Sequence, residues 1–139
     1  MRRLFACGTF LIAIFSTYSC NAQNELEQLE FAKIFVSHFS DYQMNIRSAG
    51  VATIPIATLS DENELYIEYA YQSESEDRNG KMTLSRKHKT NRFEGKWKTV
   101  ANNGNVYQGD LYFLFEDNGQ ADGFYQFNGT NYKITIFKK

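Results

Sequence analysis

The last third of the chain alternates apolar and polar residues with a regularity that predicts four consecutive antiparallel strands. Short turn signals divide it at Asn102-Asn103-Gly104, Asp117-Asn118-Gly119 and Asn128-Gly129, each with a glycine where a tight hairpin needs a positive φ. With these turn lengths one face of all four strands becomes apolar, and a one-residue slip in any hairpin would break that face. The residues that share it are Phe93, Gly95, Trp97, Gly109, Leu111, Phe113, Phe115, Ala121, Gly123, Tyr125, Phe127, Tyr132, Ile134 and Ile136.

The middle of the chain shows the same period of two. Residues 51–59 are the first predicted strand, and Pro55 within it indicates a sheet edge or a bulge. Residues 65–72 alternate next, and Asn79-Gly80 further on predicts a two-residue hairpin turn. The residues that this turn would bring to one face are Tyr69, Tyr71, Met82 and Leu84.

A helix is predicted over residues 25–40, ahead of all the strands. Asn24 has the character of an N-cap, and Glu27 stands three residues later as its capping-box partner. Apolar residues then recur at helical spacing, at Leu29, Ala32, Val36 and Phe39. The helix therefore has a broad apolar face that must be covered by the rest of the chain.

Glycines within the predicted strands indicate strong curvature, because a glycine inside a strand marks a bend or a close approach of backbones. The predicted cross-strand pairs that contain one are Gly95–Leu111, Gly109–Trp97 and Gly123–Phe113. The predicted fold class is α+β, an N-terminal helix packed on a curved antiparallel β-meander of six or seven strands. The alternative is a sheet that closes on itself as an eight-stranded, calycin-like β-barrel.

The segment Phe93-Glu94-Gly95-Lys96-Trp97 contains a Gly-x-Trp that resembles the motif opening the first strand of lipocalin-like barrels. In this chain the motif follows a helix and several strands, which departs from the order in that family. Three matching residues at a different place in the chain assign neither a family nor a function.

Residues 1–22 have the order of a bacterial signal peptide: a basic start, an apolar run and then small residues. Cleavage before Cys20 would produce a lipoprotein with a lipid on that cysteine, whereas cleavage after Ala22 would release an unanchored protein. Either choice predicts export to the cell envelope, in the periplasm or at the outer membrane. Residues 23–139 then form a single β-rich domain that has no cysteine pair for a disulfide.

Charge and motifs exclude several functions. Without Arg2 and Arg3 the chain has 13 basic and 16 acidic residues, which gives no general attraction to nucleic acid. His38 and His88 are the only histidines, and they lack metal-ligand spacing, so both are interpreted as structural or partly exposed. There is no Gly-x-Ser-x-Gly nucleophile elbow. We therefore expect neither an enzyme nor a cofactor or metal.

Two sets of residues are candidates for binding. Trp97, Phe113, Tyr125 and Tyr132 share the concave face and could contact a small apolar ligand. On the opposite face, Tyr112, Leu114 and Phe124 should cluster as a partner surface, together with the basic residues Arg86, Lys87 and Lys89.

The sequence therefore favours a non-enzymatic envelope protein, lipid-anchored through Cys20, that binds a protein partner or self-associates. The alternative function is a carrier with a barrel-type cavity for a small apolar ligand. A hydrolytic enzyme is the third hypothesis, and it would require paired carboxylates or a His–acid pair in a cleft.

Overall fold

The computed structural model describes residues 29–88 and 90–139. The predicted signal segment, its lipidation candidate Cys20 and the capping residues of the predicted helix lie outside this part. Within it a helix covers residues 29–37 and is followed by a short 3-10 turn, η1 (Phe39–Asp41). A second such turn, η2 (Asp117–Gly119), connects two strands.

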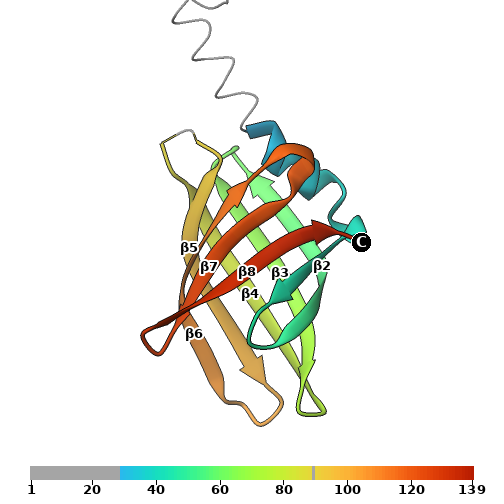
Figure 1. Ribbon diagram of the computed structural model, residues 1–139, viewed down its shortest axis with the longest axis vertical. Coiled ribbons are helices and arrows are strands. Elements are labelled where there is room, and N and C mark those ends of the chain that lie inside the picture. Colours follow the sequence, from blue (N-terminus) through green and yellow to red (C-terminus); the bar gives the residue numbers. More distant parts are fainter. Residues whose placement is uncertain (1–28, 89) are drawn as a thin grey trace, which may run out of the picture.

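The strands of the described chain form a closed antiparallel barrel in which each strand pairs with the next and the last pairs with the first (Figure 1). In chain order they are β1 (Tyr42–Ile46), β2 (Gly50–Ser60), β3 (Glu64–Ser73), β4 (Glu76–Arg86), β5 (Arg92–Ala101), β6 (Val106–Phe115), β7 (Ala121–Phe127) and β8 (Thr130–Lys138). The sheet is thus a closed eight-stranded barrel. The open meander of six or seven strands was wrong, and the barrel alternative holds.

Closure depends on β1, a strand that the sequence analysis missed. Its residues follow the helix directly, and three alternating apolar side chains were too few to separate a strand from the end of a helix. In the structure Met44 lies opposite Ile136 and Ile46 opposite Ile134, which joins the two ends of the sheet. Because β1 pairs with β8, every strand of the described chain has a hydrogen-bonded neighbour on both sides.

The predicted register of the last four strands is confirmed. Each of the three glycine pairs predicted from the sequence lies opposite its partner. A Cβ on Gly95 would lie 1.9 Å from the Thr83 carbonyl oxygen, and one on Gly123 would lie 1.8 Å from that of Tyr112. Only glycine allows the neighbouring backbone to approach this closely, and the sheet can therefore curve enough to close.

The predicted turn between β3 and β4 was wrong. The hairpin turns at Glu74 and Ser75, which both have a positive φ of 55° and 65°. Both registers pair odd-numbered with even-numbered residues, so the predicted inward face survives. Gly80 instead lies inside β4 opposite Tyr69, where a Cβ would be 2.2 Å from Cζ of the Tyr69 ring. This glycine makes room for a large inward side chain.

Pro55 marks a bulge in β2, one of its two predicted roles. The register between β2 and β3 shifts between Thr53 and Ile56. Inward residues change from even to odd numbers at this point, with Ala52 and Ile54 buried before the shift and Ala57 buried after it. The strand thereby stays in the barrel wall although proline cannot donate a backbone hydrogen bond.

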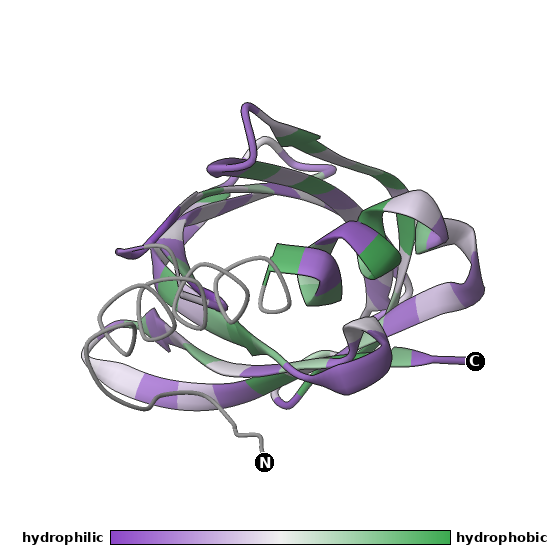
Figure 2. Cartoon of the chain, turned by 90° about the horizontal axis from the view of Figure 1, so that it is seen from above, coloured by the Kyte–Doolittle hydropathy of each residue, from purple (hydrophilic) through white to green (hydrophobic). Residues whose placement is uncertain are grey.

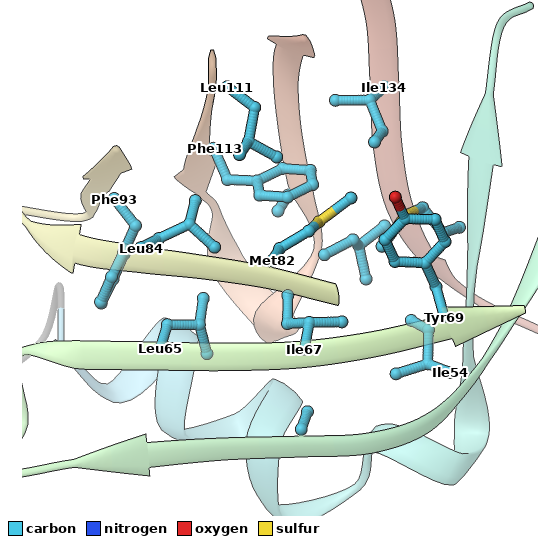
Figure 3. Packing of buried hydrophobic residues seen from close by; sticks show 14 of the residues in the cluster. Ile54, Leu65, Ile67, Tyr69, Met82, Leu84, Phe93, Leu111, Phe113 and Ile134 are labelled. Atoms are coloured by element: carbon cyan, nitrogen blue, oxygen red, sulfur yellow. The ribbon is translucent and has the colours of Figure 1, made fainter. Parts of the chain in front are cut away.

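The helix lies across one opening of the barrel (Figure 2) and is anchored there by aromatic contacts. Phe35 is fully buried, and its ring centroid is 5.4 Å from that of Tyr42 and 5.7 Å from that of Phe115. The Tyr42 hydroxyl donates a hydrogen bond to the carbonyl oxygen of Asn118. Below the helix the inward side chains fill the barrel (Figure 3). We call this the closed end.

Candidate ligand-binding site

The other end of the barrel contains a cavity of about 180 Å³. The hairpin turns there join β1 to β2, β3 to β4, β5 to β6 and β7 to β8, on the side away from the helix (Figure 1). We call it the open end. The residues that line the cavity are Ile46, Ser48, Ala49, Tyr69, Tyr71, Ser73, Arg78, Met82, Trp97, Thr99, Tyr107, Tyr125, Phe127 and Ile134.

Aromatic rings brace one side of the cavity. The Trp97 ring meets that of Tyr125 edge to face at 5.6 Å between centroids, and that of Phe127 at 5.9 Å. Tyr107 contacts the other side of Phe127, also at 5.9 Å. The indole N–H of Trp97 donates to the Gln126 carbonyl oxygen over 3.1 Å. These contacts hold the rings in place, so the wall is formed before any ligand arrives.

Two of the tyrosine hydroxyls in the cavity wall, those of Tyr69 and Tyr125, are paired with neighbouring hydroxyls. The Tyr69 and Thr99 oxygens are 2.5 Å apart, and Thr99 is almost completely buried. The Tyr125 hydroxyl forms a similar pair with that of Ser48. Burial raises the pKa of Tyr69 well above its ordinary range and raises that of Tyr125 less, in each case against the effect of the hydroxyl partner. Both phenols are therefore neutral at neutral pH.

Arg78 is the one cationic residue among those lining the cavity. Its side chain is 19% exposed, and the guanidinium carbon lies 5.2 Å from the centroid of the Tyr107 ring. The nearest carboxylate oxygen, from Glu76, is 3.7 Å from an Arg78 terminal nitrogen, longer than a hydrogen bond. Arg78 Nε is buried, and no group in the described part of the chain accepts a hydrogen bond from it.

The structure separates the four residues predicted to face a ligand. Trp97 and Tyr125 line the cavity. Phe113 is fully buried deeper in the barrel, where its ring lies 6.3 Å from that of Phe115. Tyr132 stacks on the Tyr125 ring at 5.3 Å and supports it from outside the lining. That these four residues contact a ligand stays a prediction.

Arg78 was missed because of the wrong hairpin turn. A turn at Asn79 and Gly80 would place Arg78 beside an exposed loop, where charged residues are common. In the observed register Arg78 lies opposite Tyr71 and faces inward. The available signal was the alternation itself: Arg78 and Gly80 continue the inward positions of Met82 and Leu84.

The predicted partner surface is divided in space. Tyr112, Leu114 and Phe124 lie on the outer wall of β6 and β7, where Leu114 is 38% and Phe124 43% exposed. The Arg92 guanidinium covers the Tyr112 ring at 3.8 Å. The basic residues Arg86 and Lys87 lie instead at the connection between β4 and β5, where the Arg86 Nε donates to the Thr90 carbonyl oxygen over 2.7 Å. Lys89 lies outside the described residues.

Both histidines of the chain are exposed, His38 after the helix and His88 in the connection after β4. Across residues 29–88 and 90–139, no group of three or more His, Cys, Asp or Glu side chains is placed to hold a metal ion. The same residues include no helix with both the length and the apolar character needed to cross a membrane.

No protein-family model matches the sequence, and neither a curated protein nor a solved structure shows significant similarity to this chain. Its function therefore has to be argued from the cavity itself.

Proposed function

We propose that this protein binds a small, mainly apolar molecule in the cavity at the open end of its barrel. The single observation that carries the proposal is that cavity of about 180 Å³ between the Trp97 and Tyr69 sides of the barrel. An apolar cavity of roughly 150 Å³ is large enough to hold benzene. The ligand is therefore a molecule with about one ring, or a short aliphatic chain of similar size.

The contrast with the rest of the barrel supports this proposal. Protein interiors pack densely, and a void costs stability, so a void that is kept suggests a use. The closed end shows that this chain can fill a barrel completely with Phe35, Phe93 and Phe115, all of which are fully buried. The open end also carries aromatic residues, but their rings line a cavity and do not fill it. An apolar pocket with a few placed polar groups is typical of small-molecule sites.

The size of the cavity narrows the carrier hypothesis. A carrier of long-chain lipids would need a void of several hundred cubic ångströms. The observed volume supports a compact ligand instead. The role that the sequence favoured first, binding of a protein partner through Tyr112, Leu114 and Phe124, stays a prediction.

Export is part of the same proposal and rests on the sequence of residues 1–22. A binding protein in the cell envelope would meet small molecules that enter from outside. Incorporation of labelled palmitate by the wild-type protein and its loss in Cys20→Ala would support a lipid anchor. Equal labelling of both, or of neither, would count against it.

Trp97 provides the test of ligand binding, because it is the single tryptophan of the chain and lines the cavity. We expect its fluorescence to change in a saturable way when 3-phenylpropan-1-ol, a neutral one-ring probe, is titrated into the protein. Calorimetry should give the same dissociation constant as the fluorescence change.

A pair of matched variants shows whether the probe enters the cavity. Ala49 lines its mouth, so Ala49→Phe should fill the entrance and weaken binding at least tenfold. Ala70 lies on β3 between the inward residues Tyr69 and Tyr71 and faces outward, so Ala70→Phe should leave binding unchanged. Binding that is absent, or that is lost equally in both variants, would overturn the proposal.

A further inference from the structure

We infer that the ligand of this cavity carries an anionic head group of the carboxylate class, and that Arg78 binds it. This inference rests on the proposed function and adds the chemistry of the ligand to it. Three features support it: the place of Arg78 in the barrel, its buried Nε donor without an acceptor in the described chain, and the polar groups near it at the rim of the cavity.

Arg78 lies at the rim of the open end with its side chain turned inward. Its Cα pairs with Tyr71 of β3 on one side and with Ala101, the last residue of β5, on the other. Charged side chains at the end of a strand normally extend into water, but this one is 81% covered, being 19% exposed. The guanidinium lies on the Tyr107 ring, which fixes its plane beside the cavity.

The hydrogen bonds of this guanidinium are incomplete. Arginine has five N–H donors and stays charged at all accessible pH values. The Tyr71 side chain is within hydrogen-bonding reach of the guanidinium, and Glu76 stands 3.7 Å away as an ion pair without hydrogen-bond contact, but buried Nε has no acceptor among the described residues. A buried donor without an acceptor is costly. A carboxylate that reached the rim would supply two acceptor oxygens in the geometry that the guanidinium fork favours.

On its β3–β4 side the cavity suits a molecule with an apolar body and a charged end. Met82, Ile134 and Trp97 line it from strand positions further from the hairpin turns, whereas Arg78, Ser73 and Tyr71 line it close to the β3–β4 turn. A ring would lie against the first group while its carboxylate reached the second. A single aromatic or short aliphatic acid would contact both groups of residues. A neutral molecule of the same size would give Arg78 no carboxylate to bind.

Glu76 competes for the same cation, and this gives the inference a second, opposite prediction. Removing the charge of Glu76 should leave Arg78 free to bind an external carboxylate more strongly. Arg92 provides a matched control, because it also covers a tyrosine ring and pairs with a glutamate, Glu94, but on the outer wall.

The experiment compares 3-phenylpropionate with 3-phenylpropan-1-ol at pH 7, by Trp97 fluorescence and by calorimetry. In the wild-type protein we expect the acid to bind at least about tenfold more tightly than the alcohol, the effect of one charged hydrogen-bonded pair. Arg78→Gln should abolish this preference, because it should weaken binding of the acid much more than binding of the alcohol. Glu76→Gln should increase the preference, and Arg92→Gln should leave it as in the wild type.

The outcomes distinguish a failure of the inferred head group from a failure of the proposed function. If the alcohol binds in the cavity but the acid binds no more tightly, or if Arg78→Gln keeps the preference, the inference about the head group is overturned and the proposed function stands. If neither compound binds, both are overturned. If Arg78→Gln weakens both compounds equally, Arg78 supports the structure of the cavity and has no role as an anion receptor, which also overturns the inference.

Discussion

The two ends of this barrel use aromatic residues in different ways. The closed end is filled mainly by phenylalanines, with Phe35 of the helix and Phe93, Phe113 and Phe115 of the barrel fully buried, beside one buried tyrosine, Tyr42. The open end carries tyrosines and the tryptophan, and the polar atoms of Tyr69, Tyr125 and Trp97 are hydrogen-bonded within the wall of a cavity.

The physical reason for this difference lies in the polar atoms. A phenylalanine can be packed on every side, whereas a tyrosine hydroxyl or an indole N–H must keep a hydrogen-bond partner. Phenylalanine therefore fits a sealed core, and tyrosine fits a wall that faces a polar or partly filled space. We therefore expect substitutions at the helix end to reduce stability most, and substitutions at the cavity end to change binding with a smaller loss of stability.

The largest expected effect is the loss of the helix anchor. Phe35→Ala should lower the free energy of unfolding by about 3–5 kcal/mol, because it removes a fully buried ring and leaves a cavity. Urea denaturation measures this change. The control is Ile34→Ala on the same helix, where the side chain is 36% exposed and the expected cost is about 1 kcal/mol or less. Equal losses in the two variants would show that the closed end is not the stable end.

Gly80→Ala tests the open end by adding one methyl group. The new Cβ would overlap the end of the Tyr69 side chain, and that ring can move into the empty cavity. We expect a loss of about 1–3 kcal/mol in stability, the usual range for overpacking, together with weaker binding of the neutral probe. Gly95→Ala is the comparison, because its Cβ would meet backbone and the strands themselves would have to separate. If Gly80→Ala is as unstable as Gly95→Ala, the Tyr69 side chain does not move more easily than the backbone of the barrel wall, and this expectation is wrong.

The tyrosines give the protein a sensitivity to alkaline pH. Burial raises the pKa of Tyr69 and Tyr125 above the ordinary value of 10.0, so above about pH 10 the unfolded chain loses protons that the folded protein keeps. The free energy of unfolding should therefore be unaffected below this pH and fall above it, by about 1.4 kcal/mol per pH unit for each such tyrosine.

Urea midpoints between pH 8 and 11 measure this slope. Burial raises the pKa of Tyr42 at the closed end in the same direction, so the wild-type slope contains contributions from both ends. Tyr69→Phe isolates the open end and should make the slope shallower. An unchanged slope in this variant would mean that the Tyr69 phenol is ionised as easily in the folded protein as in the unfolded chain.

The smallest expected effect is that of the Tyr69 hydroxyl on stability at neutral pH. Tyr69→Phe removes the partner of the buried Thr99 hydroxyl at the same ring volume, which should cost about 1 kcal/mol. Tyr112→Phe on the outer wall is the matched control and should change stability by less than about 0.5 kcal/mol. A neutral result at Tyr69 would indicate that Thr99 finds another partner in the cavity.

Most of the barrel wall could be predicted from the sequence, because its determinants are local. Alternation of apolar and polar residues fixes which side chains point inward, and turn length fixes the register of a hairpin. The glycine pairs of β5, β6 and β7 followed from these two rules, and so did the inward position of Trp97 and Tyr125. The rules failed at Asn79 and Gly80, where a good turn sequence stood in a strand because Tyr69 needed the space above Gly80.

The faces of the strands and the pairing of β5 to β8 follow from the sequence alone, since both depend on residues close together in the chain. Closure of the sheet is a property of the folded molecule, because it joins β1 to β8 at opposite ends of the described chain. The tertiary structure also decides which inward residues pack against one another and which surround a void. That outcome depends on how the whole barrel and its helix fill space, and Arg78 at the rim of the cavity is its most informative result.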